Sequence, residues 1–229
     1  MFAFIDALTR AFEPFTILLA LLPLIGYLVV FSVIRLSGRA LVTTGARDIA
    51  ALAIAISGML AIGPAELFFP TAAATMFGPL VWIALGVFYA LSVSLIALTS
   101  QPRLVVYGRT PDELFEPLLA AARQVDTAAV GDASLQQVLL PSIGIRLRID
   151  GQRGIDYSQV LSFEPNMSLR FWSKLLGALR SEVRKQASPM PRRGFAMLLV
   201  AMALCFLLVW KSFGNQELVV EGFRDWLWR

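Results

Sequence analysis

The sequence predicts an α-helical membrane protein with about four transmembrane helices and a small α+β domain inserted between the third and the fourth. Four long apolar segments predict the helices, and a change to amphipathic patterning between the last two segments predicts the domain. A helix needs about 20 mostly apolar residues to cross the hydrocarbon core of a bilayer. The composition agrees, since 57% of the residues are hydrophobic and only 16% are charged.

The four apolar segments extend over roughly Phe15 to Ile34, Ile49 to Ile62, Phe77 to Thr99 and Phe195 to Trp210. The second is short for a full crossing, and Gly63-Pro64 and Gly78-Pro79 interrupt the apolar sequence after it. Residues 49–79 therefore form either a hairpin of two full spans, which we favour, or a re-entrant segment. Asp6 and Glu13 lie where a signal peptide carries basic residues, so we expect the first segment to remain attached.

The positions of arginine and lysine predict the orientation. The loop between the first two segments carries three arginines, and the long insert begins with Arg103 and ends with Arg192-Arg193. Basic residues next to membrane spans favour the cytoplasmic side. We therefore expect a multi-pass protein of a bacterial plasma (inner) membrane, with residues 101–193 in the cytoplasm and both termini outside.

The insert alternates between strand and helix patterns. Thr110 is a good N-cap with Glu113 three residues later, and an apolar face continues to about Val125. A second helix is predicted by the stripe Leu169, Trp172, Leu176, Leu179 and Val183. Strands are predicted at Leu104 to Tyr107, Leu135 to Leu140, Ile143 to Ile149 and Tyr157 to Phe163. The order is β-α-β-β-β-α, with both helices on one face of a small sheet.

These patterns divide the chain into four parts. They are 1–100, with an N-terminal interfacial segment and three transmembrane helices; 101–190, the cytoplasmic domain; 191–212, the fourth transmembrane helix; and 213–229, an outward-facing amphipathic tail. Only Gln101-Pro102 separates the third span from the first strand, and proline stiffens this linker. We therefore expect the domain to lie against the inner surface of the bilayer.

A group of basic residues is the first candidate site. These residues lie on the second predicted helix and on the segment after it. They are Arg170, Lys174, Arg180, Arg184, Lys185, Arg192 and Arg193. Near anionic lipid head groups such residues contribute about 1 kcal/mol each to binding. A partner-binding face and a merely solvated face are the alternatives. Aromatic residues do not alternate with these charges as stacking on bases requires, so we expect no nucleic-acid partner.

Three further residues are singled out by position. Glu66 is the only acid in the turn between the second and third segments, and an ionisable group at membrane depth is a candidate polar site. A hydrated carboxylate at the interface is the simpler interpretation. Trp226 and Trp228 are expected to be anchors at the membrane interface, where tryptophan is enriched.

The sequence contains no catalytic signature. It has no histidine, its one cysteine (Cys205) lies in the fourth apolar segment, and a glycine-rich phosphate loop is absent. Histidine is the commonest general base and the commonest metal ligand. We therefore expect neither enzyme activity nor a cofactor or bound metal.

Four segments resemble a family of uncharacterised bacterial multi-span membrane proteins with a small cytoplasmic α+β domain. They are Val42 to Asp48, Gly63 to Pro70, Tyr107 to Leu114 and Leu139 to Gly144. The resemblance covers most of the first 150 residues. It supports the predicted topology and implies no activity.

Two classes of function remain. The first is a non-catalytic assembly subunit, scaffold or regulator that acts through its membrane-apposed cytoplasmic domain, with anionic lipid head groups and other membrane-protein subunits as partners. The alternative is a component of a transporter or channel, in which Glu66, Ser57, Ser92 and Ser94 line a path. Transport paths carry ionisable groups near the bilayer midplane, and Glu66 lies near the end of its span, so the sequence favours the first class.

Overall fold

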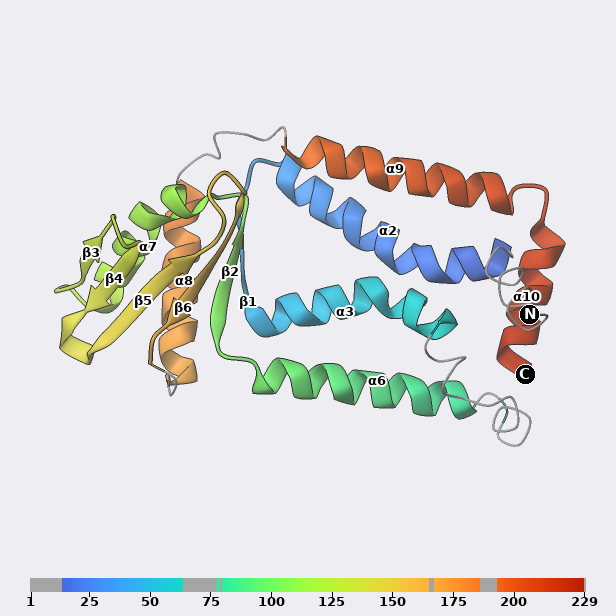
Figure 1. Ribbon diagram of the computed structural model, residues 1–229, viewed down its shortest axis with the longest axis horizontal. Helices are drawn as coiled ribbons and strands as arrows, with labels where there is room; N and C mark the ends of the chain where they lie inside the picture. Colours follow the sequence, from blue (N-terminus) through green and yellow to red (C-terminus); the bar gives the residue numbers. More distant parts are fainter. Residues whose placement is uncertain (1–13, 64–77, 79, 165–166, 186–192, 229) are drawn as a thin grey trace. The chain divides into compact units, whose positions relative to one another are not determined.

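A computed structural model describes residues 14–63, 78, 80–164, 167–185 and 193–228 of the chain. The chain divides into two compact units, whose elements are labelled in Figure 1. The helix unit comprises Met1–Phe31, Ala50–Ile96 and Ala196–Arg229, and the sheet unit comprises Ser32–Ile49 and Ala97–Phe195.

Four helices in the described part of the chain are long and apolar enough to cross a membrane. They are α2 (Pro14–Leu36), α3 (Gly45–Ile62), α6 (Leu80–Thr99) and α9 (Arg193–Ser212). The helix α3 begins before the predicted Ile49 and reaches 18 residues, a length sufficient for a crossing. The turn between α3 and α6, with Glu66 in it, lies outside the described residues.

Three contacts join helices of the helix unit. A side chain at Gly58 of α3 would collide with the backbone carbonyl of Leu19 in α2, so this contact requires glycine. Tyr89 of α6 donates a hydrogen bond of 2.8 Å to the carbonyl oxygen of Ala53 in α3. A fifth helix, α10 (Gln216–Trp228), contacts α2 through the rings of Phe223 and Phe15, whose centroids are 6.0 Å apart.

The sheet unit is built on a six-stranded antiparallel sheet with the strand order β1-β2-β6-β5-β4-β3. The strands are β1 (Leu41–Thr44), β2 (Arg103–Tyr107), β3 (Val130–Asp132), β4 (Gln137–Leu140), β5 (Ile145–Asp150) and β6 (Tyr157–Ser162). The predicted order lacked β1 and β3. The first runs directly into α3, outside the predicted range 101–190, and the second has only three residues, too few to show a period.

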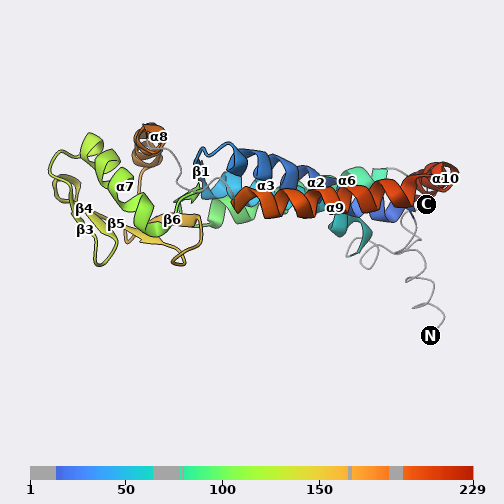
Figure 2. The same ribbon diagram turned by 90° about the horizontal axis from the view of Figure 1, so that it is seen from above.

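Two amphipathic helices, α7 (Pro111–Val125) and α8 (Leu169–Lys185), cover the same side of this sheet (Figure 2). The predicted start of α7 is confirmed: the Glu113 amide donates to the Thr110 hydroxyl, and the Thr110 amide donates to the Glu113 carboxylate. Fully buried side chains from both helices pack on alternate strand residues, among them Leu118, Leu175, Val138, Leu147 and Val160.

The buried stripe of α8 differs from the predicted one. Leu169 is 81% exposed and Leu176 is half-buried, whereas Phe171 and Leu175 are buried. Two neighbouring stripes on this helix satisfy the three-four spacing, because Leu175 and Leu176 are adjacent. The spacing alone therefore did not determine which stripe meets the sheet.

Candidate functional site

Four of the basic candidates form an exposed face on α8. We call it the basic face; it consists of Arg170, Lys174, Arg184 and Lys185, all exposed. At 100° per residue these side chains fall within an arc of about 100°, opposite the buried stripe. Among the described residues, the only ion pair recorded for this face joins Lys185 Nζ to Glu182 at 2.6 Å. The face therefore presents a concentrated positive charge.

Arg180 does not belong to this face. It is half-buried, and its Nε donates a hydrogen bond of 3.0 Å to the carbonyl oxygen of Val42 in β1. Its role in the described structure is to hold α8 against the edge strand. A test of the basic face should therefore leave Arg180 unchanged.

The other candidates from the sequence are only partly described. Glu66 and Arg192 lie outside the described residues, and Arg193 begins α9 without a described side chain. Trp226 and Trp228 lie in α10, but their side chains are likewise outside the described part. Their proposed roles therefore stay predictions.

The sheet unit contains one end of each of the four apolar helices. It includes Ser32–Leu36 of α2, Gly45–Ile49 of α3, Ala97–Thr99 of α6 and Arg193–Phe195 of α9. The strand β1 is continuous with α3, and only Ser100–Pro102 joins α6 to β2. The sheet and these four helix ends consequently form one compact body.

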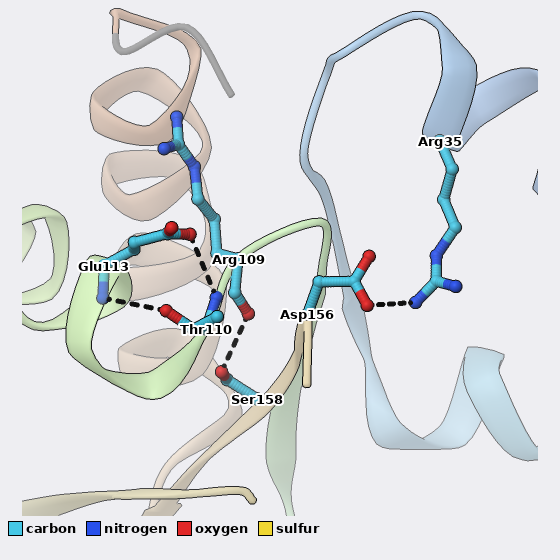
Figure 3. A network of polar contacts seen from close by, with 6 residues as sticks. All are labelled: Arg35, Arg109, Thr110, Glu113, Asp156 and Ser158. Atoms are coloured by element: carbon cyan, nitrogen blue, oxygen red, sulfur yellow. Dashed lines mark hydrogen bonds and ion pairs between the residues drawn. The ribbon is translucent and has the colours of Figure 1, made fainter. Parts of the chain in front are cut away.

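A partly buried ion pair fixes the end of α2 in this body (Figure 3). The guanidinium of Arg35 lies 2.9 Å from the carboxylate of Asp156, and both side chains are 16% exposed. Arg35 is in the last turn of α2, where the helix dipole favours a positive charge. In the same region, the buried hydroxyl of Ser158 in β6 donates to the Arg109 carbonyl oxygen at 3.0 Å.

The first turn of α3 is held by a buried acid. Asp48 is 7% exposed and accepts a hydrogen bond of 2.6 Å from the hydroxyl of Tyr107 in β2. The ring of Tyr107 lies 5.2 Å from that of Tyr157 in β6. A carboxylate in the first turn of a helix is also favoured by the helix dipole. Asp48 thus connects α3 to β2.

The start of α9 lies against the end of α2. A Cβ at Gly194 would lie 2.9 Å from the Cβ of Arg35 and 3.0 Å from the Leu36 amide nitrogen. Only glycine allows this approach without a shift of the neighbouring chain.

Sequence reasoning missed the residues that make these connections. Arg35 and Asp156 are 121 positions apart, and Asp48 and Tyr107 are 59 apart, so no local pattern relates them. The one local signal was the acid at position 48, next to an apolar helix.

No metal site is found in the described residues, since no cluster of three or more His, Cys, Asp or Glu side chains occurs there. Comparison of the chain with protein-family models, with curated proteins and with solved structures gave no match.

Proposed function

We propose that this protein is a non-catalytic integral membrane protein that acts as an assembly subunit, scaffold or regulator through its sheet unit. The observation that supports this most is that the sheet unit incorporates one end of all four apolar helices. Ion pairing at Arg35 and hydrogen bonding at Asp48 fix two of these ends directly. Such a body is suited to present a rigid surface at the membrane and to respond to movements of the four helices whose ends it contains.

The proposed location is a bacterial plasma membrane, with the sheet unit in the cytoplasm and both termini outside. Arginines flanking the sheet unit support this orientation, as does the even number, four, of apolar helices in the described part of the chain. Cysteines at Ser134, in the turn after β3, and at Gln216, at the start of α10, test it, because both positions are exposed. With Cys205 replaced by alanine, an impermeant thiol reagent should reach only one of them from each side. Labelling of both positions from the same side would contradict the proposed topology.

The basic face of α8 is the proposed docking surface for anionic lipid head groups. Its charge complements a lipid surface, and each basic residue is worth about 1 kcal/mol there. The attraction between exposed charges weakens as salt shortens the screening length to about 3 Å at 1 M. Other membrane-protein subunits are the second proposed class of partner.

An environment-sensitive dye on the basic face tests the lipid contact. Ser181 is exposed and lies within the arc of the basic face, so a dye at Ser181→Cys, with Cys205 replaced by alanine, reports on that surface. In full-length protein in nanodiscs, phosphatidylglycerol should shift its emission to shorter wavelength relative to phosphatidylcholine. High salt and the triple change Arg170→Gln, Lys174→Gln and Arg184→Gln should each remove the shift.

A dye on α7 provides the matched control. Glu116 is exposed on the outer side of that helix, and a dye at Glu116→Cys should not respond to phosphatidylglycerol. Equal responses at both positions, or none at either, would contradict docking through the basic face.

A transport role has less support. The segments 14–34, 49–62, 80–99 and 194–210 contain no Asp, Glu, Lys or Arg. Paths for ions and charged substrates usually carry ionisable groups near the bilayer midplane. The described parts of the four helices therefore favour the scaffold or regulatory class.

A further inference from the structure

A cavity of about 250 Å³ lies in the sheet unit, where β6 ends and the chain enters β2. Its wall includes Gln101 and Arg148 together with Leu161, Phe163 and Trp172. Ligand sites of proteins are commonly 300–1,000 Å³ and combine an apolar wall with a few polar groups. This cavity is slightly smaller, which limits the ligand to a small molecule or a single chemical group.

The apolar part of the wall includes the indole of Trp172. Trp172 is only 6% exposed, and its indole Nε1 has no hydrogen-bond partner in the described structure. Buried indole N–H groups usually have an acceptor. The Nε1 atom has almost no accessible surface, so Trp172 contributes apolar surface to the wall together with Leu161 and Phe163.

The polar part of the wall is dominated by donors. The Arg148 side chain is 46% exposed, and its recorded partner, Asp150, is 3.5 Å away and itself 55% exposed. Such an exposed pair contributes little and leaves the guanidinium available. Gln101 adds an exposed side-chain amide next to the end of α6.

Glu164 also lines the cavity, but its carboxylate is already engaged. It accepts hydrogen bonds from the Arg146 amide at 3.0 Å and from the Ser162 hydroxyl at 2.9 Å. Its second oxygen faces the Arg146 guanidinium at 3.7 Å. Because these groups already occupy both oxygens of Glu164, the group of the wall that remains to bind an acid is the guanidinium of Arg148.

We propose that the cavity binds a small amphipathic acid. The apolar body of the ligand packs on Leu161, Phe163 and the Trp172 ring, and its carboxylate or phosphate group is bound by the planar guanidinium of Arg148 with the Gln101 amide. This site is independent of the basic face of α8, so it stands or falls separately from the proposed docking of lipid.

Quenching of Trp172 fluorescence by 4-bromobenzoate tests the proposal, because bromine quenches only at contact. Of the five tryptophans in the chain, Trp82, Trp210, Trp226 and Trp228 are replaced by phenylalanine in the full-length protein. In phosphatidylcholine nanodiscs, 4-bromobenzoate should quench Trp172 along a saturable curve. The uncharged 4-bromobenzamide should bind at least tenfold more weakly.

Substitutions in the wall identify the binding groups. Arg148→Gln and Gln101→Glu should each lower the affinity for 4-bromobenzoate about tenfold or more, while Arg153→Gln, an exposed arginine outside the cavity wall, should leave it unchanged. Linear quenching without saturation, equal binding of acid and amide, or binding unaffected by both wall substitutions would overturn the proposal.

Addition of phosphatidate to the nanodiscs distinguishes two sources of the acid. Loss of 4-bromobenzoate binding would mean that the site takes a lipid head group, and unchanged binding would mean that it takes a free acid. The effect of Arg148→Gln must accompany either result.

Discussion

The two helices that cover the sheet, α7 and α8, bury similar apolar faces but carry opposite charges on their outer faces. The sequence of α7 has three acids and one base, whereas that of α8 has five bases and one acid. The helices also touch: the Gln124 side-chain amide of α7 donates to the Glu182 carboxylate of α8 at 2.6 Å. Both pack on the same core, so packing on this sheet does not require a basic helix. The exposed charge of the basic face is therefore not needed to pack α8 on the sheet.

The largest loss of stability is expected from substitutions in the buried core that both helices share. Leu118 of α7 and Leu175 of α8 are both fully buried, so Leu118→Asp and Leu175→Asp should each unfold the sheet unit. An unpaired buried charge costs several kcal/mol, a large share of the roughly 5–15 kcal/mol that stabilises a folded protein. Thermal melts of the full-length protein, followed by limited proteolysis, measure this. Leu176→Asp, at a half-buried position, should be milder, and equal losses at Leu175 and Leu176 would contradict the buried stripe described above.

A smaller loss of stability is expected when the N-cap side chain of either helix is removed. Thr110→Ala removes a reciprocal capping box and should cost about 1 kcal/mol. On α8, the Ser168 hydroxyl accepts only from the Phe171 amide at 3.2 Å, and phenylalanine cannot return a hydrogen bond. Ser168→Ala should therefore cost about 0.5 kcal/mol. Chemical denaturation of the two variants gives the comparison, and a larger loss at Ser168 would reverse it.

Acid should weaken two connections in the sheet unit, one at Asp126 after the end of α7 and one at Glu164 after the end of β6. Partial burial raises the pKa of Asp126, but hydrogen bonds from the Ser142 hydroxyl and from the Ala128 and Ser142 amides outweigh this and hold it below its ordinary value. Partial burial likewise raises the pKa of Glu164, and the Arg146 amide and Ser162 hydroxyl more than compensate.

A carboxylate with a lowered pKa in the folded state stabilises the fold above its unfolded pKa and loses that contribution as pH falls through the folded value. We therefore expect the melting temperature to fall below about pH 4. Asp126→Asn should lower the melting temperature at pH 7 and make its further fall in acid, the acid limb, less steep. An acid limb as steep as that of the wild type would show that other groups cause the loss.

The smallest expected effect is on stability when the outer charges are removed. Arg170→Gln, Lys174→Gln and Arg184→Gln on α8, and Glu116→Gln on α7, should each change the free energy of unfolding by less than about 0.5 kcal/mol. Arg180→Gln should cost about 1 kcal/mol, because it loses the hydrogen bond to Val42. Denaturant titrations separate the two groups, and a destabilised triple variant would assign the basic face to folding.

Local sequence patterns predicted some elements well and others not at all. The start of α7 followed from the residues at its first turn, because the capping box is a contact between neighbours in sequence. The strand β1 was missed, since its four residues are recognisable as a strand only through pairing with β2. The same limit applies to the candidate site. The basic face is a periodic feature of one helix and was visible, but the contact that removes Arg180 from it comes from β1.

The position of β1 also determines when the first strands can pair during synthesis of the chain. Residues 45–102 separate β1 from β2, its partner in the sheet. At about 5–20 residues per second, the ribosome needs about 3 to 12 s to synthesise this interval. During that time β1 has no partner, and both α3 and α6 are completed before β2 emerges. Pairing of β1 with β2 consequently follows the synthesis of α3 and α6, and a chain arrested after α6 has made three of its four apolar helices before a single pair of strands can form.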